Sequence, residues 1–237
     1  MIRTDGSFDT AIPFDHREIV IEKHDDVYVV GDVHGCLDAL ETLLSTLEIT
    51  NEDLVLFVGD LVRKGPESRA VVDRIHESPQ LLSVRGNNEQ KLIDGDASLP
   101  GFGSTAYEIM ESFPVAIRWD GGLVVHGGLD PGRTIAEHSV ADVQTMRAPD
   151  GDGYDGPFWF GDYNGPPRVF FGHTVLDRPF ESEWAVGLDT GCVYGGTLTA
   201  YDISRQRFVS VDSNGHVDRS DDKIVATDDR LGVNHNG

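Results

Sequence analysis

The chain has 237 residues, of which 41 are acidic and 19 basic, and its formal net charge is −22. This length is enough for one substantial core, and because no linker-like stretch divides it we expect a single domain over residues 1–217, followed by a polar, flexible tail over residues 218–237. The charge excludes docking onto nucleic acid, which needs a basic surface, and is typical of a halophilic protein, because at ~1 M salt a Debye length of about 3 Å screens the self-repulsion.

Apolar and amphipathic runs alternate in the first part of the chain. The short apolar runs predict buried strands and the amphipathic runs predict helices. In chain order these are a strand at 27–30, a helix at 37–47, a strand at 54–58, a helix at 67–77, a strand at 81–84 and a helix at 89–93. Such repetition implies parallel strands covered by helices.

Strands dominate the pattern after about residue 100. We expect a helix at 104–112 and then a hairpin of strands 115–119 and 123–125, with the turn signal Asp120-Gly121-Gly122 between them. Further strands are predicted at 168–171, 184–188, 198–203 and 207–211, and residues 150–165, rich in glycine, aspartate and proline, predict a loop near the site. The fold class is therefore α/β (α+β), with two packed mixed β-sheets flanked by helices.

Two further features bear on the compartment. The N-terminal residues 1–15 contain no apolar stretch with the length of a signal peptide or membrane span, so we expect a cytoplasmic protein with no membrane partner. The two cysteines, Cys36 and Cys192, do not support a disulfide framework, and we interpret both as small buried packing residues.

Five spaced motifs place polar side chains directly after apolar runs. The motifs are GDVHGC, GDLVRKGP, RGNNE, VVHGGL and FFGHT, which carry Asp32, Asp60, Asn87, His126 and His173. Ligands collect at the carboxyl ends of strands in α/β sheets, where a rigid strand holds each donor in place. A single Asp-x-His pair would more often be an ordinary polar feature, but five motifs in order predict a two-metal site.

The motifs resemble those of the metallophosphoesterase superfamily, also called calcineurin-like. The similarity is greatest to the branch shared by serine/threonine protein phosphatases (PPP), the bacteriophage lambda phosphatase and symmetrical diadenosine tetraphosphatases. It runs from about Val27 to Asp202 and includes the stretches RGNNEQKLIDG and GLDTGCVYGGTLTAYDI. The resemblance implies a four-layer fold and a metal-dependent phosphoric ester hydrolase.

The resemblance also implies the ligand set. Asp32 and His34 would hold the first metal, Asn87, His126 and His173 the second, and Asp60 would bridge both. The expected cofactors are two divalent metal ions, manganese by resemblance, with iron or zinc as alternatives. The implied reaction is an in-line displacement by a metal-bridging hydroxide.

Four positions near these motifs are candidate catalytic or phosphate-binding residues. Lys64 stands where the family usually has arginine, and Arg147 resembles a later phosphate-binding arginine, although an ordinary surface cation is the alternative. Asn88 replaces the family's general-acid histidine, and Arg63 replaces the aspartate that orients that histidine in the protein phosphatases. Because asparagine cannot titrate, we expect slow attack on alkyl phosphates, while Arg63 could support the leaving group electrostatically.

Three functions remain open from the sequence. The leading hypothesis is a phosphatase of the serine/threonine (or tyrosine) protein phosphatase type, favoured by RGNNEQKLIDG. The second is a bis(5'-nucleosyl)-tetraphosphatase or related nucleotide phosphoanhydride hydrolase, favoured by GDLVRKGP and the missing acid. The third is a weakly active metal- and phosphate-binding module, favoured by the changes at Asn88 and Arg63. The expected partner is thus a phosphorylated protein or a nucleotide, and we expect a monomer.

Overall fold

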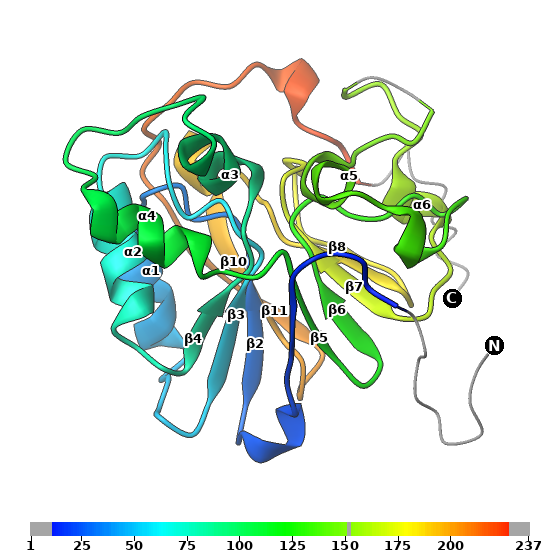
Figure 1. Cartoon of the computed structure of the whole chain (residues 1–237), viewed down its shortest axis with the longest axis horizontal. Helices are drawn as coiled ribbons and strands as arrows, with labels where there is room; N and C mark the ends of the chain where they lie inside the picture. The colour runs from blue at the N-terminus through cyan, green and yellow to red at the C-terminus, as the bar shows by residue number, and fades with distance from the viewer. Residues whose placement is uncertain (1–10, 151–152, 228–237) are drawn as a thin grey trace.

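The computed structural model describes residues 11–150 and 153–227, which form two sheets with helices outside them (Figure 1). The first sheet has the strand order β11-β10-β2-β3-β4. Its strands are β2 (Val27–Val30), β3 (Leu54–Phe57), β4 (Leu81–Ser83), β10 (Thr197–Asp202) and β11 (Arg207–Asp212). The neighbours β2, β3 and β4 run parallel, and β10 joins β2 antiparallel, so the sheet is mixed.

The second sheet has the order β1-β5-β6-β7-β9-β8 and is also mixed. Its strands are β1 (His16–Glu18), β5 (Ala116–Trp119), β6 (Gly122–Val124), β7 (Arg168–Phe171), β8 (Phe180–Glu181) and β9 (Ala185–Gly187). The predicted hairpin is present, because Trp119 pairs with Gly122 across β5 and β6. Gly121 in its turn has φ +84°, which glycine adopts without steric cost.

Helices cover the outer faces of the sheets and also lie above the strands at the top of the view (Figure 1). They are α1 (Leu37–Thr46), α2 (Ser68–His76), α3 (Asn87–Ile93), α4 (Ser104–Glu111), α5 (Val140–Thr145) and α6 (Trp159–Asp162). Short 3-10 turns are η1 (Ile21–Lys23), η2 (Ile135–Glu137), η3 (Cys192–Tyr194) and η4 (Asp221–Lys223). In the first sheet, α1 packs on β10 and β11 and α2 packs on β4.

Strand alternation divides the buried side chains among three clusters. In β2, Val27 and Val29 face the layer between the two sheets, while Tyr28 and Val30 face the helices α1 and α2. Because successive side chains of a strand point to opposite faces, a strand covered on both sides is apolar throughout. This is why the strands could be predicted from continuous apolar runs, and it confirms the predicted layers of helix, sheet, sheet and helix.

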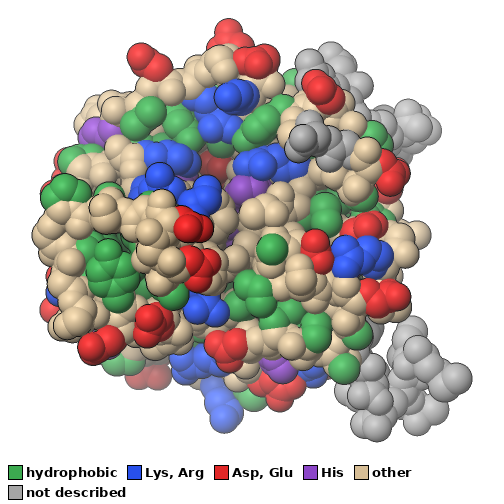
Figure 2. Space-filling view, turned by 45° about the horizontal axis from the view of Figure 1, so that its top comes forward, with side chains coloured by type: hydrophobic (Ala, Val, Ile, Leu, Met, Phe, Trp, Pro, Cys, Tyr) green, Lys and Arg blue, Asp and Glu red, His purple; other side chains and the backbone are tan. Residues whose placement is uncertain are grey.

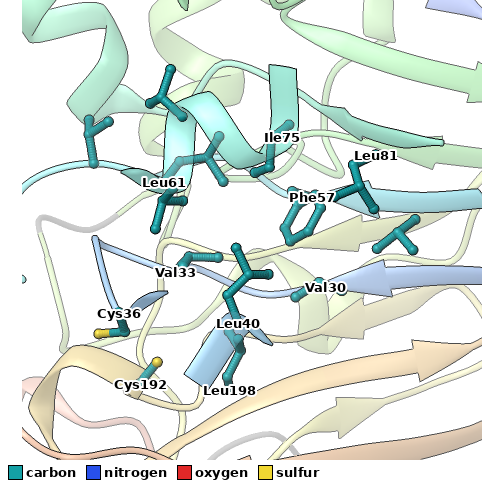
Figure 3. Close-up of a cluster of buried hydrophobic side chains, with 14 of the residues drawn as sticks. Val30, Val33, Cys36, Leu40, Phe57, Leu61, Ile75, Leu81, Cys192 and Leu198 are labelled. Carbon is teal, nitrogen blue, oxygen red and sulfur yellow. The ribbon is translucent and has the colours of Figure 1, made fainter. Parts of the chain in front are cut away.

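The cluster beneath α1 and α2 includes both cysteines (Figure 3). Cys36 and Cys192 are 3% and 2% exposed and are free thiols, as their interpretation as packing residues requires. Leu40 and Phe57 in the same cluster are fully buried. Burial of each such large apolar side chain stabilises the fold by about 1.5–3 kcal/mol relative to leaving it exposed.

Several segments differ from the sequence predictions. Residues 150–165, expected to be a loop, contain the short helix α6, whose Trp159 and Phe160 are both 1% exposed. The strands β1 and β8 were not predicted, because two or three residues give no periodicity to detect. Within the polar, flexible tail expected over 218–237, Val225 is 1% exposed and pairs with Leu176. Residues 228–237 lie outside the described residues. No helix among the described residues is long and apolar enough to cross a membrane.

Candidate active site

The predicted ligand side chains lie at the carboxyl ends of strands from both sheets. Asp32 follows β2 and Asp60 follows β3, while His126 follows β6 and His173 follows β7. Contacts cross from one sheet to the other, because His126 Nε2 lies 3.3 Å from Asp60 Oδ1. The His173 backbone N–H also donates to both carboxylate oxygens of Asp32, at 3.3 Å. Segments separated by 141 positions therefore meet at one edge of the sandwich.

Asp32, His34 and Asp60 form a buried cluster with the geometry of a metal site. His34 Nε2 lies 3.8 Å from Asp32 Oδ2 and 3.6 Å from Asp60 Oδ2, and each side chain is at most 2% exposed. One ligand atom from each of the three lies within 4.8 Å of the others. His34 Nδ1 is 3.0 Å from the Val62 carbonyl, which fixes the ring so that Nε2 faces the carboxylates.

His126, Asn87 and His173 form the second part of the cluster. His126 Nδ1 is 2.8 Å from the Val58 carbonyl, and its Nε2 is 3.0 Å from Asn87 Oδ1. The rings of His126 and His173 lie 5.0 Å apart between centroids, and His173 Nε2 is buried without a hydrogen-bond partner. An orphaned imidazole nitrogen beside carboxylate and amide oxygens fits a divalent cation, because a buried polar atom normally has a partner.

Three residues of the cluster have a strained backbone. His34, Asp60 and His173 have φ angles of 49°, 51° and 63°, in the left-handed region that non-glycine residues rarely adopt. Each such residue costs about 1–3 kcal/mol and persists only where its surroundings hold it. Gly172 is equally constrained, since a Cβ there would lie 2.0 Å from Asp32 Oδ1. The backbone is thus shaped to bring these groups together.

The charges of the cluster are unbalanced without a cation. Burial and the carboxylates of Asp189 and Asp60 raise the pKa of Asp32 well above its ordinary value. Burial alone would raise the pKa of Asp60 as well, but His126 and His34 overcome this and hold it well below. Burial lowers the pKa of His126, yet the carboxylates of Asp60 and Asp32 outweigh burial and raise it to about 9. Added positive charge would stabilise the ionised forms of the buried carboxyl groups.

Glu89 holds the loop that carries Asp60. Its carboxylate accepts the backbone N–H groups of Asp60 at 2.9 Å, Leu61 at 2.8 Å, Val62 at 3.2 Å and Gly86 at 2.8 Å. Glu89 is fully buried at the third position of α3, where a carboxylate also caps the start of the helix. One side chain therefore sets the position of the loop after β3 relative to α3.

Asn88, Arg63 and Asp60 form a hydrogen-bonded chain. The Asn88 side-chain amide donates to Asp60 Oδ2, and its backbone N–H donates to Asp60 Oδ1 at 2.9 Å. Arg63 donates from one terminal guanidinium nitrogen to Asn88 Oδ1 at 2.7 Å. The structure brings both predicted residues to the cluster and engages both hydrogen-bonding ends of the asparagine amide. The asparagine amide does not titrate, so it cannot supply a proton as a histidine would.

Lys64 and Arg147 also reach the cluster. The Lys64 ammonium lies 2.7 Å from His34 Nε2. Arg147 donates to the His173 carbonyl at 3.4 Å, and its guanidinium lies over the ring of Tyr154, 4.7 Å from the centroid. Arg147 Nε is buried without a hydrogen-bond partner. Both cations that the sequence proposed for phosphate binding therefore lie beside the ligand side chains.

These groups line a cavity of about 270 Å³. We call the six ligand candidates the floor, namely Asp32, His34, Asp60, Asn87, His126 and His173. Five of them line the cavity, and His126 is fully buried beside Asp60. We call the lysines and arginines that line the cavity among the described residues the rim, namely Arg63, Lys64, Lys91, Arg147 and Arg219. Figure 2 shows blue side chains gathered around a hollow that exposes histidine and acidic side chains. On a chain with a net charge of −22 this is a strong local concentration of positive charge.

Sequence reasoning missed several residues of the site, among them Glu89, Lys91 and Arg219. Glu89 is part of a quoted motif and occupies the third helical position, a signal that could have identified its capping role. Lys91 follows the same motif on α3. Arg219 lies in the segment expected to be a flexible tail, and no pattern in the sequence indicates its contact with the cavity.

The sequence profile of the calcineurin-like phosphoesterase family matches residues 26–187. The chain therefore belongs to this family and is a metallophosphoesterase, a hydrolase class that works with divalent metals. This confirms the resemblance proposed from the motifs, and the two mixed sheets flanked by helices agree with it.

Two relatives with assigned activities and one solved structure are similar to most of this chain. A bis(5'-nucleosyl)-tetraphosphatase PrpE [asymmetrical] of Bacillus velezensis is 29% identical, covering 81% of this chain and 94% of that protein. Serine/threonine-protein phosphatase 1 of Salmonella typhimurium is 26% identical, covering 73% and 89%. A crystal structure provisionally assigned as a diadenosine tetraphosphatase superposes with a TM-score of 0.77 at 30% identity, covering 85% of this chain and 99% of that one.

Proposed function

We propose that this chain hydrolyses the phosphoanhydride chain of a bis(5'-nucleosyl) tetraphosphate or a related nucleotide, rather than a phosphoprotein. The similarity to tetraphosphatases over nearly their full length supports this choice. It reverses the order of the two leading hypotheses from the sequence, in which the protein phosphatase came first. The weakly active binding module ranks third, because the floor has the donors of a complete metal site.

The observation that carries the proposal is the amide at Asn88, which is held between Asp60 and Arg63. A non-titrating group there cannot protonate a leaving oxygen, and positioned proton transfer is typically worth about 10²–10⁴-fold in rate. A phosphate leaving group needs little help, because its second pKa of about 6 lets it depart ionised at neutral pH. A serine alkoxide is far more basic and does need an acid.

The floor would hold two divalent cations. In the proposed assignment Asp32 and His34 bind one, Asn87, His126 and His173 bind the other, and Asp60 lies between them. The mixture of oxygen and imidazole donors suits manganese, which we propose, with iron or zinc as alternatives. Such cations supply charge neutralisation at phosphoryl oxygens and lower the pKa of a bound water.

The rim orients and neutralises the substrate. The contacts of Lys64 with His34 and of Arg147 with the His173 carbonyl support a role for both cations in binding oxygens of the transferred phosphoryl group. The hydrogen bond from Arg63 to Asn88 supports a role for Arg63 beside the leaving group, where a fixed cation would stabilise the negative charge that develops as the bridging P–O bond breaks. The oxygen of water bonds to phosphorus and its released proton passes to solvent, while the bridging P–O bond breaks and the leaving phosphate keeps the electron pair of that bond.

The test is a parallel assay of one manganese-loaded preparation in concentrated salt. Diadenosine tetraphosphate, a phosphoserine peptide and a phosphotyrosine peptide are compared by kcat/KM, with the nucleotide products separated chromatographically. We expect the tetraphosphate to be preferred over the phosphoserine peptide by about 10²-fold or more, the value of the missing acid. A higher kcat/KM on the phosphoserine peptide would contradict the proposal and restore the protein phosphatase hypothesis.

A further inference from the structure

Arg219 reaches the cavity from a segment outside the matched family region, which ends at residue 187. It donates to the hydroxyl of Tyr194 at 3.0 Å and to the hydroxyl of Tyr154. Its guanidinium also lies 4.7 Å from the ring centroid of Tyr194 and 5.2 Å from that of Tyr154. Two aromatic side chains 40 positions apart thus hold one arginine in place.

Two other rim cations share the same rings. Arg147 lies 4.7 Å from the Tyr154 centroid, and Lys64 lies 5.2 Å from the Tyr194 centroid. Arg147 and Lys64 also touch the floor, whereas the hydrogen bonds of Arg219 go to the two tyrosines and to the Lys223 carbonyl. Each tyrosine ring therefore contacts Arg219 and one of the two cations that touch the floor.

The segment that carries Arg219 is held by other contacts, so the two tyrosines are not needed to fix it. Val225 already fixes the segment, because it is buried and its backbone N–H donates to the Val175 carbonyl at 2.8 Å. Thr227 adds hydrogen bonds to Asp177 at 3.1 Å. Among the described residues no carboxylate forms an ion pair with Arg219, and Asp222 interacts with its charge only from a longer distance. A guanidinium on the wall of a cavity lined by several cations, oriented by two tyrosines and with no ion pair to a described carboxylate, has the properties of an anion site.

We propose that Arg219, held by Tyr154 and Tyr194, binds the phosphate that follows the transferred phosphoryl group in a polyphosphate chain. This subsite rests on the proposed function, because only an anhydride carries a second phosphate. It makes Arg219 a specificity-determining residue: it favours di- and polyphosphates over monophosphates and leaves the reacting phosphoryl group to Lys64 and Arg147.

The test measures binding through inhibition, so that it does not depend on cleavage of the anhydride. Hydrolysis of p-nitrophenyl phosphate is inhibited by orthophosphate or by a methylene-bridged diadenosine tetraphosphate, which cannot be cleaved at the replaced bridges. For Arg219→Gln we expect the Ki of the analogue to rise about tenfold, the effect of losing a charge-assisted hydrogen bond. The Ki of orthophosphate and the KM of the nitrophenyl ester should stay within about twofold.

Two further variants control for charge and for folding. Arg207→Gln removes one positive charge from β11, where Arg207 pairs with Asp202 at the opposite end of the sheet, and should change neither Ki. Arg219→Lys keeps the charge but loses the two-pronged donor, so it should raise the Ki of the analogue by a smaller factor. If Arg219→Gln does not fold, Arg219→Lys tests the proposal in its place.

Each outcome decides the proposal. Parallel shifts in both Ki values, or no shift in a folded Arg219 variant, would show that Arg219 is a structural tie and would overturn the subsite. An analogue that binds wild type no more tightly than orthophosphate would also overturn it. If the analogue binds tightly through Arg219 but diadenosine tetraphosphate is not cleaved, the subsite stands and the proposed function falls.

Discussion

The floor and the rim of the cavity are built by different means. Five of the six floor side chains are at most 9% exposed and follow the ends of central strands, where backbone carbonyls such as those of Val58 and Val62 fix their orientation. The rim side chains come from loops, from α3 and from the 213–227 segment, and tyrosine rings position several of them. Buried strand ends give a fixed geometry, whereas loop cations can differ between relatives without disturbing it.

This difference separates chemistry from selectivity. A change in the floor should abolish activity on every substrate, because each reaction of the site depends on the same ligands. A change in the rim should alter the ranking of substrates, because each cation contacts only part of a phosphate chain. The predictions below test that division, from the largest expected effect to the smallest.

The largest effect is expected for Asp60→Asn, which removes the charge between the two proposed cation positions. We expect kcat/KM to fall by about 10³-fold or more on both p-nitrophenyl phosphate and diadenosine tetraphosphate, as for loss of preorganised charge stabilisation. The matched control is Asp53→Asn, a buried aspartate at the opposite end of β3 that accepts backbone hydrogen bonds from Asp26 and Thr50. The control should lose stability but keep the kcat of its folded fraction, and a loss within tenfold for Asp60→Asn would break the division.

Asn88→His tests the missing acid at the boundary of floor and rim. We expect turnover of a phosphoserine peptide to rise by about 10-fold or more, within the range that a general acid supplies, while turnover of p-nitrophenyl phosphate changes by less than about threefold. Arg63, where an orienting aspartate would help, keeps the gain below the maximum. Equal changes on both substrates in steady-state assays would show that Asn88 does not limit leaving-group departure.

Glu89→Gln tests the support beneath the floor. A neutral amide cannot accept all four backbone N–H groups as well as a carboxylate does, so we expect the free energy of unfolding to fall by about 2 kcal/mol. Metal affinity should weaken by about 10–100-fold, as for other residues that orient metal ligands.

The comparison variant for Glu89→Gln is Glu137→Gln, which changes a glutamate that caps an exposed 3-10 turn. It should cost about 1 kcal/mol or less in urea unfolding and leave metal affinity unchanged. Similar costs for the two variants would show that Glu89 is an ordinary cap.

Salt should raise the stability of the fold and weaken the binding of anions at the rim. Between ~0.1 M and ~1 M potassium chloride the Debye length falls from about 10 Å to about 3 Å, which screens the repulsion within a chain of net charge −22. We expect the free energy of unfolding to rise by about 1 kcal/mol and Tm by about 2–4 °C. The Ki of the tetraphosphate analogue should rise at the same time, because its attraction to the rim is screened; a Tm that falls with salt would contradict the halophilic interpretation.

The clustering of the floor side chains could be predicted from the sequence because each candidate ligand is local to an apolar run. Asp32 and Asp60 directly follow strands whose burial makes every residue apolar, so both the strand and its end can be found without knowing the fold. Arg219 could not be predicted, because its contacts with Tyr154 and Tyr194 join distant segments that carry no periodicity. Helix α6 was missed for a related reason, since its four residues are held by the burial of Trp159 and Phe160 rather than by an amphipathic pattern.

The central claim is that six side chains from five distant segments hold a pair of divalent cations. Anomalous diffraction from crystals grown with manganese tests it most directly. The account predicts two peaks at the floor, one beside Asp32 and His34 and one beside Asn87, His126 and His173, with Asp60 contacting both. Peaks elsewhere on the chain, or none at the floor while the protein is folded, would contradict it.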